Sequence, residues 1–346
     1  MTQPFPFSAI VGQDDMKLAM ILTAIDPSIG GVLVFGDRGT GKSTAVRALA
    51  GLLPPIDQVA SCPVNSASTE ACPDWAELSD TSIVSRPTPV VDLPLGVTED
   101  RVLGALDIER ALTRGEKAFQ PGLLARANRG YLYIDEVNLL EDHIVDLLLD
   151  VAQSGENLVE REGLSIRHDA RFVMVGSGNP EEGELRPQLL DRFGLSVEVR
   201  SPTTIDDRVE VIRRRDNYDR DPAGFCAKWQ AEDAKIRADI LAARSQLDQI
   251  TTDEAALIRC AQLCSALGSD GLRGELTLLR TARALAAFDK ADTVSMDHIR
   301  RIAAIALHHR LRRDPLDEVG SSLRVLRALD ALDTPDTTDD AESPAP

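Results

Sequence analysis

Eight consecutive residues form a complete phosphate-binding motif of the pattern G-x-x-x-x-G-K-[ST]. They are Gly36, Asp37, Arg38, Gly39, Thr40, Gly41, Lys42 and Ser43, and Thr44 follows directly. An apolar run precedes the motif and a helix-compatible run follows it, which is the strand–loop–helix context in which this motif holds phosphate. The loop N–H groups and the helix start attract phosphate oxygens. We therefore expect Lys42 to contact the β- and γ-phosphates of ATP and the Ser43 hydroxyl to ligate Mg²⁺.

Two adjacent carboxylates, Asp135 and Glu136, follow a second apolar run at residues 131–134. Because both leave the same strand end, one can face a metal and the other the γ-phosphate. We expect Asp135 to hold Mg²⁺ opposite Ser43 and Glu136 to polarise the attacking water. Without the phosphate-binding motif, two exposed acids at a strand end would be the simpler interpretation.

A third apolar run, residues 173–176, leads through Ser-Gly to Asn179 and a proline. An asparagine at such a strand tip can hydrogen-bond both the γ-phosphate and the lytic water, and we expect Asn179 to do so. The alternative is an Asn-Pro pair that only forms a turn.

These side chains need a sheet that brings the ends of the apolar runs together. Strand candidates lie at residues 32–35, 131–134, 171–176 and 195–199, with helical patterns such as residues 142–153 between them. This alternation predicts an α/β domain with a largely parallel sheet over residues 1–205. We expect it to carry two insertions: a β-hairpin at 158–166, and a proline-rich stretch at 54–102 that is either extended structure or a poorly ordered linker.

From about residue 206 the pattern is helical almost throughout. Helices are expected at residues 205–215, 235–247, 252–267, 275–288 and 296–312. We therefore predict an all-α second domain over residues 206–326. The acidic remainder, residues 327–346, is expected to be disordered.

Charge and composition restrict the kind of protein. The 346 residues carry a formal charge of −18, which argues against a nucleic-acid motor, because such proteins gain affinity from Lys and Arg. No run of 18 apolar residues is present and the N-terminus lacks the features of a secretory signal, so we expect a cytoplasmic protein without a membrane span. The five cysteines form no metal-binding spacing, and free thiols are expected.

The order of these motifs, with Leu185-Arg-Pro-Gln-Leu-Leu-Asp-Arg-Phe193 after the asparagine, resembles that of AAA+ ATPases. The resemblance implies that Arg192 acts as an arginine finger in the site of a neighbouring subunit, with Arg186 as the alternative. It also implies that Val11 and Gly12 pack on adenine. Arg273, at the start of a helix in the α-domain, would then contact the γ-phosphate, unless it is only a surface arginine.

The segments at 104–112 and 119–130, together with the hairpin, are similar to the AAA+ clade of replicative helicases, MoxR proteins and chelatase motors. Within it, residues 32–43, 89–96 and 311–317 resemble the ATPase subunits of magnesium chelatases in their bacterial form. The resemblance implies a ring, a hexamer, that uses ATP and Mg²⁺. It would work with a second AAA+ subunit carrying an integrin-like domain and with a large porphyrin-binding subunit, to insert Mg²⁺ into protoporphyrin IX. A MoxR-like ATPase that matures another metalloenzyme is the alternative.

Overall fold

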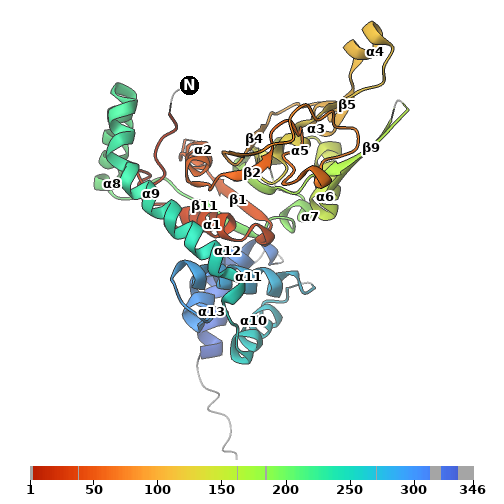
Figure 1. Ribbon diagram of the computed structural model, residues 1–346. Coiled ribbons are helices and arrows are strands. Elements are labelled where there is room, and N and C mark those ends of the chain that lie inside the picture. Colours follow the sequence, from red (N-terminus) through yellow and green to blue (C-terminus); the bar gives the residue numbers. More distant parts are fainter. Residues whose placement is uncertain are drawn as a thin grey trace, which may run out of the picture. The chain divides into compact units, whose positions relative to one another are not determined.

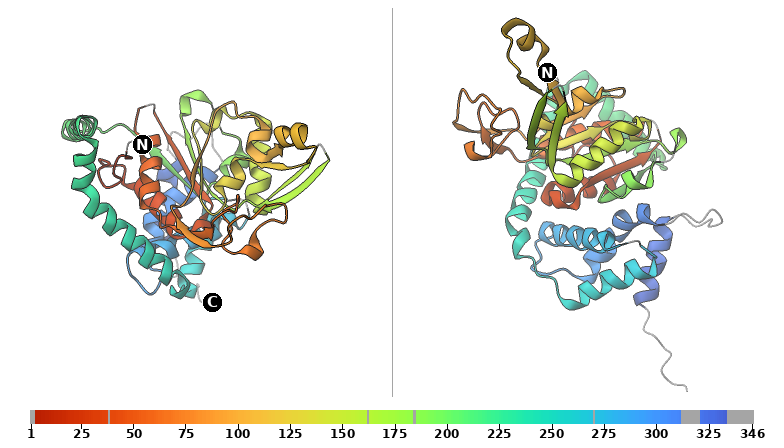
Figure 2. Two further views of the ribbon diagram at one scale, coloured as in Figure 1. Left: turned by 45° about the horizontal axis from the view of Figure 1, so that its top comes forward. Right: turned by 90° about the vertical axis from the view of Figure 1, so that its right-hand side faces the viewer.

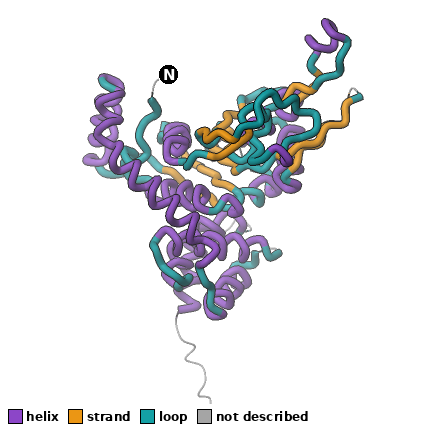
Figure 3. Tube along the Cα trace, in the orientation of Figure 1, coloured by secondary structure: helices purple, strands orange, loops and turns teal. Residues whose placement is uncertain are grey.

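The computed structural model describes residues 3–37, 39–161, 163–183, 185–269, 271–311 and 321–333. The chain divides into two compact units, Met1–Ser245 and Gln246–Pro346 (Figure 1). Figure 3 shows that strands occur in the first unit and that the second is built from helices and loops. The predicted fold class, an α/β domain with a parallel sheet followed by an all-α domain, is confirmed.

The first unit is organised around a five-stranded parallel sheet in the order β11-β1-β10-β7-β4. The strands are β1 (Gly31–Gly36), β4 (Val90–Leu93), β7 (Tyr131–Ile134), β10 (Val173–Gly178) and β11 (Leu195–Val199). β7 and β10 are buried at every position, as expected for parallel strands that are covered on both faces. Four of these strands were predicted from the sequence, and β4 was not.

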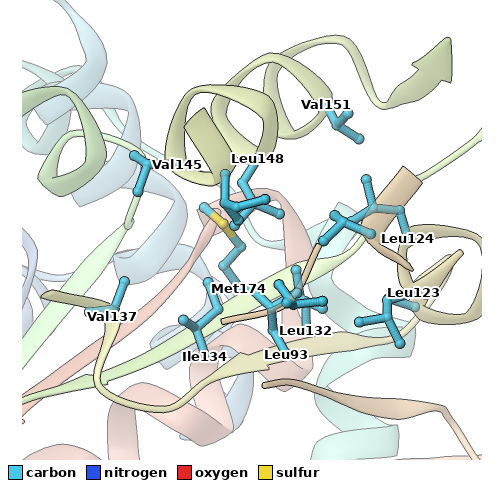
Figure 4. Close-up of a cluster of buried hydrophobic side chains, with 14 of the residues drawn as sticks. Leu93, Leu123, Leu124, Leu132, Ile134, Val137, Val145, Leu148, Val151 and Met174 are labelled. Carbon is cyan, nitrogen blue, oxygen red and sulfur yellow. The ribbon is translucent and has the colours of Figure 1, made fainter. Parts of the chain in front are cut away.

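Side chains along β7 point alternately to the two faces of the sheet, and their contacts show which helices cover each face. The hydroxyl of Tyr131 donates to the carbonyl of Thr23 in α1 (Asp14–Ile25), and Tyr133, two residues on, faces the same side, where α2 (Lys42–Leu52) lies. Leu132 and Ile134 face the other side, where they meet α6 (Asp142–Ser154) and α5 (Leu123–Ala127) in one core cluster (Figure 4). The sheet is therefore a middle layer between helices.

Gly31, at the start of β1, offers a test of how tightly the sheet is packed. Its φ is +122°, and a Cβ there would lie 2.2 Å from the carbonyl oxygen of Met174 on β10. Gly31→Ala therefore adds both backbone strain and a clash, and we expect it to lower the free energy of unfolding by about 3 kcal/mol or more in urea titrations. Gly51→Ala is the matched control.

Gly51 lies in the last turn of α2, and a Cβ there would meet no atom within 4 Å. Alanine stabilises a helix relative to glycine, so Gly51→Ala should raise the free energy of unfolding by about 0.5–1 kcal/mol. Equal stabilities of the two variants would contradict the strand register at Gly31.

Three β-hairpins form separate two-stranded sheets outside the five-stranded sheet. They are β2 (Ile56–Val59) with β3 (Ile83–Arg86), β5 (Gly104–Leu106) with β6 (Phe119–Pro121), and β8 (Glu156–Arg161) with β9 (Leu164–Asp169). α4 (Ile108–Arg114) is carried at the tip of the second hairpin and projects from the unit (Figure 2). The β8–β9 pair is the hairpin that the sequence predicted, although it is longer than residues 158–166.

The stretch at 54–102 differs from the prediction. Only its first part is an insertion, because Val90–Leu93 is the edge strand β4, paired in parallel with β7. The insertion also packs on its neighbours: the Trp75 indole N–H donates to the carbonyl of Arg167 at 3.2 Å, and its ring meets that of Phe119 at 4.9 Å between centroids. His168 lies 6.0 Å from the same indole ring. Side chains from all three hairpin regions thus meet around Trp75.

The domain boundary also differs from the predicted residue 206, because α8 (Ile205–Arg220) and α9 (Pro222–Gln246) belong to the first unit. Asp233 of α9 accepts from the backbone N–H groups of Phe7 and Ser8, at 3.3 and 2.9 Å. The Arg244 side chain donates to the carbonyl of Ala24 at 2.6 Å. A helical sequence pattern shows that a helix forms, but it does not show on which domain the helix packs.

The second unit contains α10 (Glu254–Ala266), α11 (Arg273–Phe288), α12 (Met296–Leu307) and α13 (Ser321–Asp333). α13 extends past residue 327, where sequence analysis expected disorder to begin; Val325 and Leu329 are buried, and Asp333 accepts from Arg259 at 2.5 Å. Residues 334–346 of the predicted tail lie outside the described residues. Cys260 and Cys264 are buried free thiols, as expected.

Short helices and turns complete the chain. They are α3 (Glu99–Leu103), α7 (Pro187–Leu190), η1 (Pro27–Ile29), η2 (Thr69–Ala71), η3 (Val137–Leu139), η4 (Pro180–Glu182), η5 (Leu247–Gln249) and η6 (His308–Arg310). Across the described part of the chain, no helix combines the length and the apolar character that crossing a bilayer requires.

Candidate nucleotide-hydrolysis site

Three segments with reactive side chains lie at one edge of the sheet. The phosphate-binding loop, residues 36–43, follows β1; Asp135 and Glu136 follow β7; and Asn179 follows β10. β10 pairs with both β1 and β7 in parallel, so the carboxyl ends of the three strands are adjacent. In open α/β sheets this edge is where ligands bind.

The phosphate-binding loop has the backbone geometry of an anion site. Gly39 and Gly41 have φ values of +78° and +84°, and a Cβ at either would meet no atom within 4 Å, so the space beside both is open. α2 begins at Lys42, and its N-cap residue, Gly41, has no side chain that could satisfy the first N–H groups of the helix. These groups and the helix dipole therefore fit a phosphate.

Lys42 lies against this loop. Its ammonium group donates to the carbonyls of Gly36 and Asp37, the latter at 3.1 Å. Partial burial lowers the pKa of Lys42, and the nearby carboxylates of Asp135, Asp37, Glu182 and Glu136 act in the opposite direction. The lysine is thus held between the loop and the acids at the ends of β7 and β10, where the phosphates of a nucleotide would enter.

The segment before α1 is tied to the loop. The Gln13 amide donates to the carbonyl of Thr40 at 2.7 Å, and the Thr40 hydroxyl donates to the carbonyl of Asp37 at 2.9 Å. Gly12 and Gln13 both have positive φ, +62° and +53°, so the chain turns sharply here. Val11 and Gly12, the predicted adenine contacts, therefore lie next in sequence to a residue that contacts the loop.

The two predicted Mg²⁺ ligands are linked by a tyrosine. The Tyr133 hydroxyl lies 3.0 Å from Ser43 Oγ and 2.8 Å from Asp135 Oδ1, and the Ser177 hydroxyl donates to the same Oδ1 at 2.5 Å. Burial, more than any other cause, raises the pKa of Tyr133 to about 12, so it remains a neutral hydroxyl. Hydroxyl and carboxylate oxygens are hard donors of the kind Mg²⁺ prefers, so this set fits that ion.

Tyr133 and Ser177 were not among the site residues predicted from the sequence. Tyr133 counts as an apolar strand residue in a hydrophobicity pattern, and Ser177 as a small one. A signal was present: each lies two residues before a predicted site residue, Asp135 and Asn179, and therefore on the same face of its strand.

Glu136 has an unusual backbone conformation. Its φ and ψ are 51° and 58°, in the left-handed region, which costs a non-glycine residue of order 1–3 kcal/mol. Its N–H donates to Ser177 Oγ at 3.2 Å, which helps to hold this conformation. Strain of this kind is concentrated at functional sites.

Asn179 is buried, with 4% of its surface exposed, and its Oδ1 accepts from the N–H of Glu181 at 3.1 Å. It therefore caps the short helix η4, which is the turn-forming role that the sequence left open. In the catalytic role, its Nδ2 would donate to a phosphate. That role stays a prediction.

Arg192 lies near the amino ends of the strands, opposite the carboxyl ends where the other predicted residues lie. Its carbonyl oxygen lies close to Gly30, at 3.4 Å from where a Cβ on that glycine would be. Gly30 precedes β1, whereas the phosphate-binding loop follows β1, so Arg192 and the loop lie at opposite ends of this strand. Its guanidinium donates to the Gln153 side chain in α6 at 2.6 Å. Arg186, the alternative finger, forms ion pairs with Asp142 and Asp146 of the same helix.

Comparisons with known proteins identify the family. The chain is 75% identical over 325 residues to the magnesium-chelatase 38 kDa subunit of Cereibacter sphaeroides, covering 94% of this chain and 97% of that one. It is 59% identical over 327 residues to the subunit of the same name from Acidiphilium rubrum, covering 93% and 95%. The chain belongs to the magnesium-chelatase 38 kDa subunit family. Family models agree: "Magnesium chelatase, subunit ChlI" matches residues 107–188 and "AAA lid domain" matches residues 258–328.

Two solved structures are similar to this chelatase subunit. A structure described as the complex between subunits BchI and BchD of magnesium chelatase contains a chain 69% identical to it, with a TM-score of 0.54, covering 93% of this chain and 99% of that one. A putative ATPase from Cytophaga hutchinsonii, 17% identical, has a TM-score of 0.63 over 94% and 91% of the chains, which shows the fold alone. The comparisons favour the chelatase interpretation over a MoxR-like remodelling ATPase.

The structure of the chelatase subunit brings most of the predicted site residues together, but not all of them. The phosphate-binding loop, the two carboxylates and Asn179 share one edge of the sheet. Arg192 lies at the other edge, and Arg273 opens α11 in the second unit, so its contact with a γ-phosphate stays a prediction. Arg38 lies outside the described residues.

Proposed function

We propose that this chelatase subunit is a motor that hydrolyses ATP to drive the insertion of Mg²⁺ into protoporphyrin IX, in bacteriochlorophyll synthesis. The observation that carries the proposal is the convergence of the phosphate-binding loop, Asp135 and Asn179 at the carboxyl edge of one parallel sheet. Two separate magnesium ions are involved: one is bound with ATP, and the other is the substrate of the complex.

Each residue has a defined part in hydrolysis. The loop N–H groups and Lys42 hold the phosphates, and Ser43 and Asp135 hold the ATP-bound Mg²⁺. When bound, this ion neutralises charge that develops on the phosphates. Glu136 accepts a proton from the attacking water, and Asn179 Nδ2 orients that water against the γ-phosphate.

The arginine finger must come from a second copy of the chain. β1 has six residues, so Arg192 at its beginning is about 20 Å along the strand from the loop at its end, at about 3.3 Å per residue. An arginine side chain cannot span that distance to its own site. A head-to-tail ring, which we expect to be a hexamer, would place Arg192 of one subunit against the phosphates bound by the next.

We also propose the surface that meets the porphyrin-binding subunit. The three hairpin regions pack around Trp75, Phe119 and His168, so the insertion and the β8–β9 hairpin form one joined surface. The second AAA+ subunit, with its integrin-like domain, is the expected ring partner, in line with the BchI–BchD complex among the similar structures.

Reconstitution tests the proposal. The purified chain is combined with the other two chelatase subunits, ATP, MgCl₂ and protoporphyrin IX, and the absorption shift of Mg-porphyrin is followed. We expect metal insertion with the wild-type chain and none with Lys42→Ala, which lacks the contact to the phosphates.

The Cereibacter sphaeroides 38 kDa subunit with the same partners is the positive control, because it shows that they are active. If that control forms Mg-porphyrin and this chain hydrolyses ATP without doing so, the chelatase role is refuted. Stimulation of its ATPase by DNA would instead support a nucleic-acid motor.

A further inference from the structure

We propose that Tyr133 is a positioning residue for the metal half of the site, and that it acts together with Ser177. The two hydroxyls fix Asp135 and Ser43 in the arrangement that receives Mg²⁺. The inference rests on the proposed function, because it takes these two residues as the metal ligands.

The strand order explains why a tyrosine is needed. β1, which leads into Ser43, and β7, which leads into Asp135, are separated by β10, so they lie about 10 Å apart at about 4.8 Å per strand. Tyr133 projects from β7 onto the face covered by α2, and its hydroxyl reaches Ser43 Oγ at 3.0 Å. Tyr133 is 2% exposed, so neighbouring side chains hold it in place. A phenylalanine would fill the same space without linking the two ligands.

Ser177 occupies the strand between them. It is 1% exposed, and its hydroxyl donates to Asp135 Oδ1 at 2.5 Å while its oxygen accepts from the N–H of Glu136 at 3.2 Å. Tyr133 reaches the same Oδ1 at 2.8 Å. Two hydroxyls therefore engage one carboxylate oxygen, and Oδ2 is the oxygen that would ligate the metal or its bound water.

The proton count agrees with this assignment. The phenol of Tyr133 has one proton, and the carboxylate is its strongest acceptor, so the proton is directed at Asp135. The phenol also donates to Ser43 Oγ at 3.0 Å, so its one proton is shared between the two ligands, while Ser177, 3.2 Å from the phenol oxygen, gives its own proton to Asp135. Outer-shell partners of this kind fix the orientation of metal ligands.

A purely structural role for the hydroxyl is the competing explanation, and the chain contains a matched control for it. Tyr131 lies on the same strand and the same face, is 3% exposed, and donates to the carbonyl of Thr23 at 3.2 Å. Tyr131→Phe removes a buried hydroxyl from the same sheet without touching the metal ligands. Tyr133→Phe removes the link.

The test measures the affinity for a fluorescent ATP analogue in EDTA and during a Mg²⁺ titration. Tyr133→Phe should bind the metal-free analogue within about twofold of wild type, because Lys42 and the loop are intact, but should need about tenfold more Mg²⁺ at the midpoint. Tyr131→Phe should match wild type in both. A wild-type Mg²⁺ midpoint in Tyr133→Phe overturns the inference. If wild type itself shows no Mg²⁺-dependent affinity, the proposed metal site fails instead.

Ser177→Ala provides a second, independent variant. It should raise the Mg²⁺ midpoint by a similar factor and also lower ATP turnover at saturating Mg²⁺, because it removes the acceptor for the Glu136 N–H. Thermal unfolding midpoints of all variants identify any that are misfolded. If Ser177→Ala changes neither quantity, Ser177 has no positioning role.

Discussion

Arg192→Ala lowers ATP turnover by about a thousandfold or more and leaves ATP binding unchanged; this is the largest effect that we expect. An arginine finger that is supplied by a partner raises the rate of hydrolysis by about 10³–10⁵. The residue lies at the amino edge of the sheet, beside Gly30, so its removal cannot disturb the phosphate-binding loop of its own subunit. Its present partner, Gln153, is a neutral amide that can release it when a neighbouring subunit docks.

Mixing two inactive variants tests whether the finger acts between subunits. Arg192→Ala keeps the carboxylate that we propose polarises water, and Glu136→Gln keeps the proposed finger. In a mixed head-to-tail ring with equal amounts of each, about a quarter of the interfaces combine an intact Glu136 with an intact Arg192. ATP turnover should therefore reappear on mixing, at roughly that fraction of the wild-type rate per site.

Arg200→Ala is the control for this experiment. Arg200 is an exposed arginine just after β11 that pairs with Glu198 at 3.1 Å, and its loss should leave turnover near normal. Near-normal turnover by Arg192→Ala alone would show that the finger is another residue, with Arg186 the next to test. Failure of the mixture to recover, with rings present by size-exclusion chromatography, would place the finger within its own subunit.

The parts of the fold that the sequence predicted are those in which local pattern and global role coincide. β1 and β7 are buried on both faces, so their sequences are unbroken apolar runs, and the residues that follow them match motifs for phosphate and metal binding. β4 could not be recognised, because a run of four residues between Pro89 and Pro94 resembles a loop in the sequence. Only its parallel pairing with β7 in the structure identifies it as a strand. Edge strands tolerate proline at their ends, which removes the usual signal.

The candidate site shows the same limit at the level of side chains. Asp135 and Ser43 could be predicted as metal ligands from their motifs alone, whereas the role that we propose for Tyr133 could not, because it depends on β10 lying between β1 and β7. That strand order arises from long-range pairing, which a local pattern does not encode. The end of α13 is a further case: Leu329 is buried by tertiary packing, although the predicted disordered tail began at residue 327.

Glu136→Gln gives the second large effect, a loss of about 10²–10⁴ in ATP turnover, which is the usual contribution of a general base. Glutamine keeps the shape of the side chain but cannot accept a proton, so the affinity for ATP should stay within about twofold of wild type. Single-turnover hydrolysis and analogue binding measure the two quantities separately. Glu141→Gln, an exposed acid at the N-cap of α6, is the control and should retain turnover.

The backbone of Glu136 makes this prediction specific. Its left-handed conformation is held by the Ser177 hydroxyl, so the side chain is aimed by the backbone as well as by its own rotamer. Glu136→Asp keeps a carboxylate in the same backbone conformation but shortens its reach, and should recover little of the lost rate. Full activity in Glu136→Asp would mean that the carboxylate acts only through its charge. Full activity in Glu136→Gln would mean that Glu136 is not the general base.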